Sequence, residues 1–208
     1  FRGEQDVRRS VFVEMSKRSS ALAENEKGEV VVVPGAWSGF EFDFSRAPIF
    51  YPLSNLTIEK GNFPSSKLYA GASFRSTRFI NDADFSEATF ISHADFSGTE
   101  FTSDANFIGT TFTSNAYFGE STFTNNANFT EAVFIGAAYF SEATFTQNAR
   151  FSETAFAQVA HFSRATFEGL AGFRNATFEA GAEFYGASFV QTADFCDSSF
   201  VKSPPLFV

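Results

Sequence analysis

Side chains of the types that catalyse reactions or bind metal ions are few in this sequence. It contains two histidines, His93 and His161, and one cysteine, Cys196. Nucleophilic catalysis needs a base beside the nucleophile, and a metal centre needs several ligands at close spacing. Neither histidine has a cysteine or a second histidine near it, and no pattern implies a base for Cys196. We therefore expect no catalytic residue, cofactor or metal site, and a protein that is not an enzyme.

The carboxylates are the more informative group, because 24 acidic residues against 15 lysines and arginines give a net charge of −9. From Phe79 to Ala149 there is no lysine or arginine, but nine carboxylates occur there. We call this candidate partner-binding set the acidic belt: Asp82, Asp84, Glu87, Asp95, Glu100, Asp104, Glu120, Glu131 and Glu142. Such a surface either keeps a protein soluble or binds a basic partner. We expect a protein partner with a basic groove, and neither direct nucleic-acid binding nor membrane binding.

The elements that must position these carboxylates follow from the phenylalanine spacing. From residue 74, phenylalanine recurs at alternating steps of five and six residues over 24 positions, and the lattice extends back to Phe63 and forward to Leu206. Two residues before each of these phenylalanines stands a small residue, in most cases alanine. Side chains alternate sides along an extended segment, so each alanine points the same way as its phenylalanine. Units this short predict the sides of a coiled β-ribbon with phenylalanine inside.

The outward residues indicate how many sides close one coil. We compare the outward residue that stands directly before phenylalanine at every fourth unit of the lattice. Two series result: Asp84, Asn106, Asn128, Arg150 and Asp95, Tyr117, Tyr139, His161. A coil of four sides, with five, six, five and six residues, gives this repeat. Stacked coils lie about 4.8 Å apart, so equivalent side chains are predicted to form vertical columns.

Two units, Ala83-Asp84-Phe85-Ser86-Glu87 and Ala94-Asp95-Phe96-Ser97-Gly98, resemble the pentapeptide-repeat family, whose unit is A-(D/N)-(L/F)-x-x. The resemblance covers residues 61–208. It implies an all-β fold, a right-handed quadrilateral β-helix or β-solenoid with four faces and about 22 residues per coil. The residue added to every second unit predicts wider corners than the family's tight turns. Some members resemble DNA and protect type II topoisomerases, which implies an acidic protein-interaction module here.

Residues 1–60 break the lattice, so we expect them to form an N-terminal cap on a solenoid of residues 61–208. Within the cap, residues 4–26 predict a polar helix, and residues 29–34 and 39–44 predict strands. The first coil is expected to be covered by the aromatic residues Trp37, Phe40, Phe42 and Phe44.

The C-terminal end is apolar. Pro204-Pro205 stops strand pairing, and Leu206, Phe207 and Val208 follow. An apolar end of this kind predicts a homodimer that forms through one end of the solenoid. Residues 1–20 have no signal-peptide pattern, and a single cysteine allows no intrachain disulfide, which favours a cytoplasmic location.

Other interpretations stay open. The chain is also compatible with a structural spacer or scaffold domain of a longer protein. Threonines on both sides of phenylalanine, as in Thr122-Phe123-Thr124, suggest an ice-binding surface. A further protein contact is suggested by an apolar stretch on the other threonine-rich face, formed by Val133, Ile135, Ala155 and Ala157.

Overall fold

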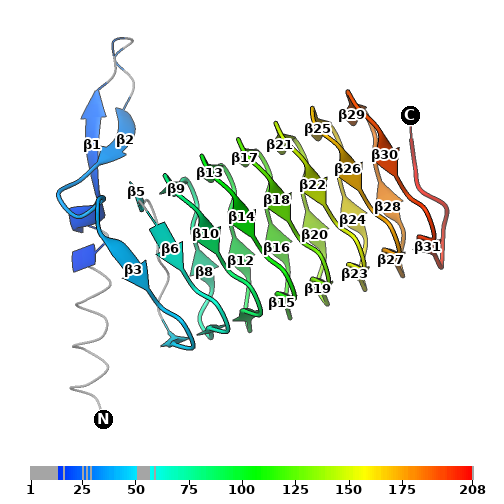
Figure 1. The fold of residues 1–208 in the computed structure, drawn as a ribbon, viewed down its shortest axis with the longest axis horizontal. Helices are drawn as coiled ribbons and strands as arrows, with labels where there is room; N and C mark the ends of the chain where they lie inside the picture. Colours follow the sequence, from blue (N-terminus) through cyan, green and yellow to red (C-terminus); the bar gives the residue numbers. More distant parts are fainter. Residues whose placement is uncertain are drawn as a thin grey trace.

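The computed structural model describes residues 14–15, 17–24, 26, 28, 30–50, 57–58 and 60–207. In this part the chain winds into a β-solenoid whose coils stack along one axis (Figure 1). Most strands are two residues long, and they form four parallel sheets, one for each side of the coil. The expected four-sided β-solenoid is therefore confirmed.

We number the four faces in the order in which one coil passes through them. Face 1 contains β3 (Glu41–Asp43), β6 (Lys60–Asn62), β10 (Ala83–Asp84), β14 (Ala105–Asn106), β18 (Ala127–Asn128), β22 (Ala149–Arg150), β26 (Ala171–Gly172) and β30 (Ala193–Asp194). Face 2 contains β4 (Pro48–Ile49), β7 (Lys67–Leu68), β11 (Thr89–Phe90), β15 (Thr111–Phe112), β19 (Val133–Phe134), β23 (Ala155–Phe156), β27 (Thr177–Phe178) and β31 (Ser199–Phe200). Face 3 contains β8 (Ala72–Ser73), β12 (Ala94–Asp95), β16 (Ala116–Tyr117), β20 (Ala138–Tyr139), β24 (Ala160–His161) and β28 (Ala182–Glu183). Face 4 contains β5 (Thr57–Ile58), β9 (Arg78–Phe79), β13 (Glu100–Phe101), β17 (Thr122–Phe123), β21 (Thr144–Phe145), β25 (Thr166–Phe167) and β29 (Ser188–Phe189).

The register between coils is the same on every face through the repeat. Ala83 pairs with Ala105 on face 1, and Ala94 pairs with Ala116 on face 3. Each residue therefore lies directly beside its equivalents in the coil before and the coil after it, as the outward series predicted.

Phenylalanine fills the interior. Every lattice phenylalanine from Phe63 to Phe184 has at most 1% of its surface exposed. Rings of successive coils stack in parallel, as Phe96 does on Phe118 at 4.8 Å. Rings from faces 1 and 3 meet edge to face across the coil, as Phe96 does with Phe107 at 5.4 Å. Both arrangements suit the charge distribution of aromatic rings, and the predicted phenylalanine ladder is confirmed.

The four corners are of two kinds. After faces 1 and 3 the corner is a tight turn, in which the amide of Ala88 donates to the carbonyl of Phe85 at 3.0 Å. The residue before that amide, Glu87, has a left-handed backbone with φ of 56°. After faces 2 and 4 the corner holds one more residue, as in Ile91-Ser92-His93. These are the wider corners expected from the six-residue steps.

The N-terminal segment differs from expectation in one respect. Glu14, Met15 and residues 17–19 are helical, but β1 (Ser20–Glu24) is a strand paired antiparallel with β2 (Val30–Pro34). The predicted helix over residues 4–26 is thus wrong for β1, because the valine-rich β2 supplies a hydrogen-bonding partner that local propensity does not reveal. Residues 4–13 lie outside the described part. The parallel ladders begin at Glu41, within the range expected as the cap, because β3 and β4 pair with β6 and β7.

Two of the four aromatic residues expected over the first coil do cover it. Phe42 and Phe44 pack on the core, and the ring of Phe44 stacks on that of Phe63 at 5.0 Å. Phe40 is 56% exposed and meets Trp37 edge to face. The guanidinium of Arg18 lies 5.1 Å from the Trp37 ring. Neither Trp37 nor Phe40 is among the residues that pack against the core.

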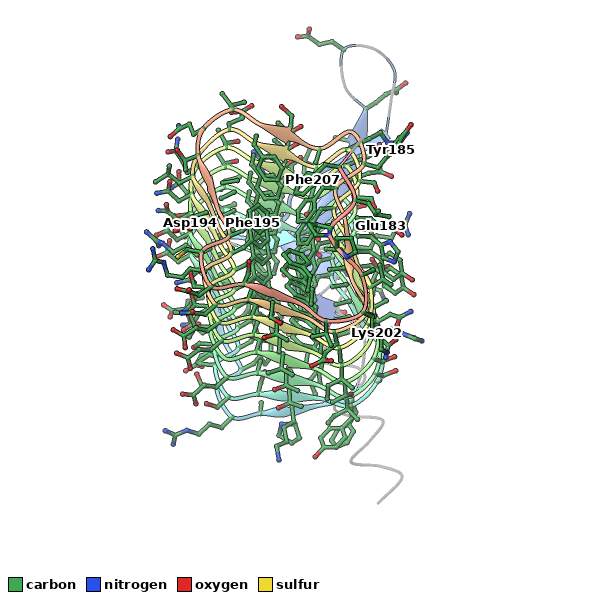
Figure 2. The ribbon with its side chains drawn as sticks, turned by 90° about the vertical axis from the view of Figure 1, so that its right-hand side faces the viewer. Glu183, Tyr185, Asp194, Phe195, Lys202 and Phe207 are labelled. Carbon is green, nitrogen blue, oxygen red and sulfur yellow. The ribbon has the colours of Figure 1, made fainter. Side chains whose placement is uncertain are left out.

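At the C-terminal end, the lattice position expected for Leu206 belongs to Phe207. The Phe207 ring stacks on Phe184 at 5.0 Å, whereas Leu206 pairs with Glu183 and is 55% exposed. The corner through Pro204-Pro205 holds one residue more than the other wide corners, which moves the lattice by one position. Figure 2 looks at this end, with Phe195 and Phe207 inside the coil and Asp194 outside it. Among the described residues, no helix is long and apolar enough to cross a membrane.

Candidate functional site: the acidic belt

The register distributes the nine carboxylates of the acidic belt around the whole coil. Asp84 lies on face 1, and Asp82 and Asp104 stand at the wide corner just before it. Asp95 is on face 3 and Glu100 on face 4. Four glutamates occupy the left-handed position of the tight corners: Glu87, Glu120, Glu131 and Glu142. The structure therefore brings only part of the belt together on one face.

Three belt carboxylates contact arginines that lie one coil away. Arg78 Nε is 3.2 Å from Glu100 Oε2, and Arg164 Nη2 is 2.5 Å from Glu142 Oε1. A longer pair joins Arg75 to Asp95 at 3.9 Å. The stretch from Phe79 to Ala149 contains no cation, but arginines outside it lie beside these carboxylates because residues in successive coils are neighbours. Such exposed pairs contribute little stability, but they cancel charge locally.

Asp82, Asp84 and Asp104 line a hollow of about 310 Å³ on face 1. One wall is the corner column of Asp82, Asp104 and Asn126, and the other is the strand column that ends at Arg150. The residues between the two walls are Ala83 and Ala105, whose methyl groups point into the core, so the floor is backbone. We call this feature the face-1 hollow. It is lined by Asp82, Ala83, Asp84, Asp104, Ala105, Asn106, Ile108, Asn126, Asn128 and Arg150.

Hydrogen bonds hold the three aspartates in place. Asn106 Nδ2 donates to Asp84 Oδ1 at 3.1 Å, and Ser103 Oγ donates to Asp82 Oδ1 at 2.7 Å. The amide and the side chain of Asn126 both donate to Asp104 Oδ1 at 3.1 Å. All of these acceptors are Oδ1 atoms. Among the described residues, the Oδ2 atoms of the three carboxylates thus remain for a donor from outside the chain.

Face 3 carries the predicted column of rings. Tyr117 stacks on Tyr139 at 5.0 Å, and Tyr139 stacks on His161 at 4.7 Å. His161 Nδ1 lies 2.8 Å from Glu183 Oε2, a contact that the sequence reasoning missed although the two residues are one coil apart. His93 is in another column, where its Nδ1 lies 3.0 Å from the hydroxyl of Ser114. No three histidine, cysteine or acidic residues within the described ranges are placed to hold a metal ion.

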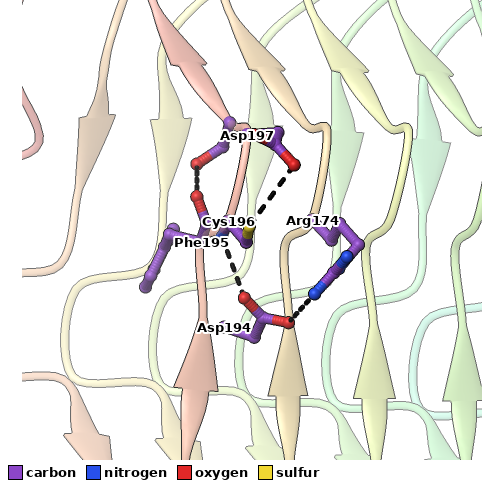
Figure 3. A network of polar contacts seen from close by, with 6 residues as sticks. Arg174, Asp194, Phe195, Cys196 and Asp197 are labelled. Carbon is purple, nitrogen blue, oxygen red and sulfur yellow. Dashed lines mark hydrogen bonds and ion pairs between the residues drawn. The ribbon is translucent and has the colours of Figure 1, made fainter.

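Cys196 is exposed and lies near the C-terminal end of the solenoid. Figure 3 shows its contacts: Sγ donates to Asp197 Oδ2 at 3.3 Å, and the amide donates to Asp194 Oδ1. Asp194 also pairs with Arg174 at 3.5 Å. The hydrogen bond and the charge of Asp197 raise the pKa of the Cys196 thiol. This environment favours the neutral thiol over the nucleophilic thiolate.

Comparison of the chain with curated proteins and with solved structures found no match. A family model described as pentapeptide repeats (9 copies) matches residues 63–111, 74–122, 107–155, 118–166 and 151–199. Together these matches run from Phe63 to Ser199 and cover more than half of the chain. They coincide with the ladder of buried phenylalanines and with the coils that carry the acidic belt. The chain therefore belongs to the pentapeptide-repeat family.

Proposed function

We propose that this solenoid is a non-catalytic module that binds a basic protein, and that the face-1 hollow receives lysine or arginine side chains of that partner. The observation that carries the proposal is the convergence of three aspartates on one hollow of about 310 Å³. Elsewhere in the belt, Asp95, Glu100 and Glu142 have arginine neighbours. Among the residues that line the hollow, the cation is Arg150, at the end of the strand column.

The chemistry of the hollow suits a cationic donor. An ammonium or guanidinium group would donate to the Oδ2 atoms, and bonds between charged groups are stronger than neutral ones. The aspartates are already oriented by Asn106, Ser103 and Asn126. Binding would therefore cost little side-chain entropy. The stacked phenylalanine core keeps the columns at fixed spacing, so the partner meets a rigid surface.

The net charge of −9 supports the same partner class. A strongly acidic protein attracts basic partners over distances up to the Debye length, about 8 Å at physiological ionic strength. Association should be fast and should weaken steeply with added salt. Within the family, members that resemble DNA bind type II topoisomerases, so a topoisomerase is one specific partner to test.

The test compares two variants that each remove three negative charges. The hollow variant is Asp82→Asn with Asp84→Asn and Asp104→Asn. Asparagine already occupies both columns at Asn126 and Asn106, where Asn106 Oδ1 accepts from the amide of Ile108, so the solenoid should tolerate these changes. The control variant is Asp95→Asn with Glu100→Gln and Glu142→Gln, which alters arginine-paired positions instead.

Both variants and the native chain are used to capture proteins from lysate at low and high salt. Each protein is then assayed for inhibition of a purified type II topoisomerase. We expect a salt-sensitive partner that the native chain and the control variant retain and the hollow variant loses. Equal partners and affinities for all three proteins would contradict the proposal, and capture of nothing would leave the spacer interpretation.

A further inference from the structure

Face 2 differs from the other faces because both of its outward columns are uncharged over four successive coils, from Thr89 and Ile91 to Ala155 and Ala157, with Lys67 and Glu179 in the flanking coils. One outward column contains Tyr69, Ile91, Thr113, Ile135 and Ala157, and the other contains Thr89, Thr111, Val133, Ala155 and Thr177. We call these ten residues the face-2 stripe. Ile91 is 42% exposed, Ile135 is 47% exposed and Val133 is 36% exposed. Aliphatic side chains thus lie in solvent on a flat sheet, with no charge between them.

The polar atoms in the stripe are partly used by the chain itself. The hydroxyl of Thr113 donates to the carbonyl of Ile91 at 2.6 Å and lies 2.9 Å from that of Phe90. The hydroxyl is thereby turned to the backbone, and the methyl group remains for contacts with a partner. At the N-terminal end the column continues through Tyr69, whose ring stacks on Phe50 at 4.9 Å. Each of the two columns spans four coil steps, as from Tyr69 to Ala157, which is about 19 Å.

The two long edges of the stripe carry different charge. Along the corner with face 1 stand Glu87, Glu131 and Glu153, all exposed. Along the corner with face 3 the residues are uncharged, as in Ser114-Asn115 and Gly136-Ala137. The stripe is therefore apolar with one acidic edge. A complementary ligand has an aliphatic stripe and a row of cations on one flank only.

The three glutamates of the acidic edge occupy left-handed backbone positions, with φ from 56° to 60°. Gly109 takes the same position between Glu87 and Glu131, with φ of 63°. Glycine adopts this conformation without the clash that a Cβ introduces. Glutamate is thus less favourable for the backbone at these three corner positions than glycine would be. Its presence there supports a role for the glutamate charge along this edge.

The geometry also selects the secondary structure of the ligand. The open strand edges of this fold lie at the ends of the solenoid, so an added strand cannot pair with face 2 from outside. A strand laid across side chains would leave its own backbone groups without partners, whereas a helix satisfies them internally. At 1.5 Å per residue, a helix that spans about 19 Å needs about 13 residues.

We infer that face 2 is a second binding surface, which takes an amphipathic helix of about 13 residues from another protein, with an aliphatic stripe and lysines or arginines on one flank. This surface is separate from the face-1 hollow and uses different side chains. The described residues of this chain contain no amphipathic helix that would cover it.

Three labelled helical peptides, each of about 15 residues to match the length of the stripe, test the inference against the full chain by fluorescence anisotropy. The first has a leucine stripe with lysines on one flank, the second has glutamates in place of the lysines, and the third has serines in place of the leucines. We expect saturable binding of the first alone. Binding of all three, or of none, overturns the inference.

The site is tested with the variant Ile91→Thr, Val133→Thr and Ile135→Thr. Threonine already occupies these columns at Thr111 and Thr113, so the fold should persist, which circular dichroism will check. We expect at least about tenfold weaker binding of the first peptide, because three aliphatic contacts are lost. Glu131→Gln with Glu153→Gln should leave binding detectable but reduce its salt dependence.

The hollow variant with three asparagines on face 1 is the matched control and should bind this peptide as the native chain does. If the hollow variant loses the peptide and the threonine variant retains it, the inference about face 2 is wrong while the proposed function stands. If the threonine changes alter only sedimentation, face 2 is covered by a second copy, and the inference is also wrong.

Discussion

Replacement of Phe118 by alanine is the sharpest test of the phenylalanine core. Phe118 is fully buried and stacks between Phe96 and Phe140, at 4.8 Å from each. It also meets Phe107 and Phe129 edge to face, at 5.4 and 5.3 Å. Phe→Ala in a core costs about 3–5 kcal/mol in free energy of unfolding. Phe118 makes ring contacts on both sides and across the coil, so we expect the upper part of that range.

Phe200 provides the matched comparison at the end of the rod. It is only partly buried, and its parallel stacking in the described part is with Phe178 at 4.7 Å. Phe200→Ala should therefore cost about 1–2 kcal/mol, since part of its surface is already exposed and it stacks on one side only. Phe118→Leu should cost less than Phe118→Ala, because leucine leaves a smaller cavity and already fills an inward lattice position on face 2, at Leu68.

The assay is equilibrium unfolding in urea, followed by circular dichroism and by intrinsic fluorescence. Coincident transitions from the two probes justify a single free energy, which is a necessary check in a repeat protein. We expect the loss of stability at Phe118 to exceed the loss at Phe200 by at least about 2 kcal/mol. Equal losses at the two positions would refute it, because they would mean that stacking across coils does not determine stability.

Three further predictions concern the corners, the thiol and the open end. Glu131→Gly should stabilise the protein by about 0.5–1 kcal/mol, because φ there is 60°, and urea unfolding will show no gain if the corner is unstrained. Because Asp197 raises the pKa of the Cys196 thiol, alkylation of this thiol by iodoacetamide should reach its maximal rate at a higher pH than alkylation of free cysteine. Asp197→Asn should move the dependence of the alkylation rate on pH to lower pH, and identical curves for the native chain and the variant would contradict this. Val190 and Val201, near the C-terminal end, are 67% and 56% exposed, so we expect sedimentation to detect a dimer of the native chain at micromolar concentration. The double variant Val190→Asp with Val201→Asp should be a monomer. If the native chain is itself a monomer, this contact does not form.

The solenoid was predictable because phenylalanine occupies the same inward position in nearly every unit of the repeat. The spacing of the phenylalanines defines the sides of the coil, and the outward series define where each coil returns to its starting face. The N-terminal hairpin was not predictable in the same way. Ser20–Glu24 has no repeat to anchor it and becomes a strand only because Val30–Pro34 lies beside it. The sequence also did not predict that the last inward position belongs to Phe207 and not to Leu206, since the length of a corner that contains two prolines does not follow from the phenylalanine spacing.

The candidate site shows the limit of reading charges along the chain. From Phe79 to Ala149 the sequence has no cation, yet Arg78 and Arg164 contact Glu100 and Glu142. In both pairs the two partners are one full coil apart, so the coil length would have revealed them. The convergence of Asp82, Asp84 and Asp104 on a hollow is different. The hollow depends on the direction in which the short side chains of two neighbouring columns point. This direction follows from the three-dimensional structure and not from the spacing of the residues in the sequence.

The constant register of the coils has a consequence for how such a rod can change its length. Insertion or loss of one whole coil would lengthen or shorten the rod by about 4.8 Å and leave every column aligned. A change of half a coil would instead bring the face-1 series beside the face-3 series, so that Asp84 and its column would meet Tyr117 and Tyr139. A change by whole coils therefore preserves both the phenylalanine core and the outward columns, whereas a change by half a coil preserves the phenylalanine spacing but exchanges the neighbours within each outward column.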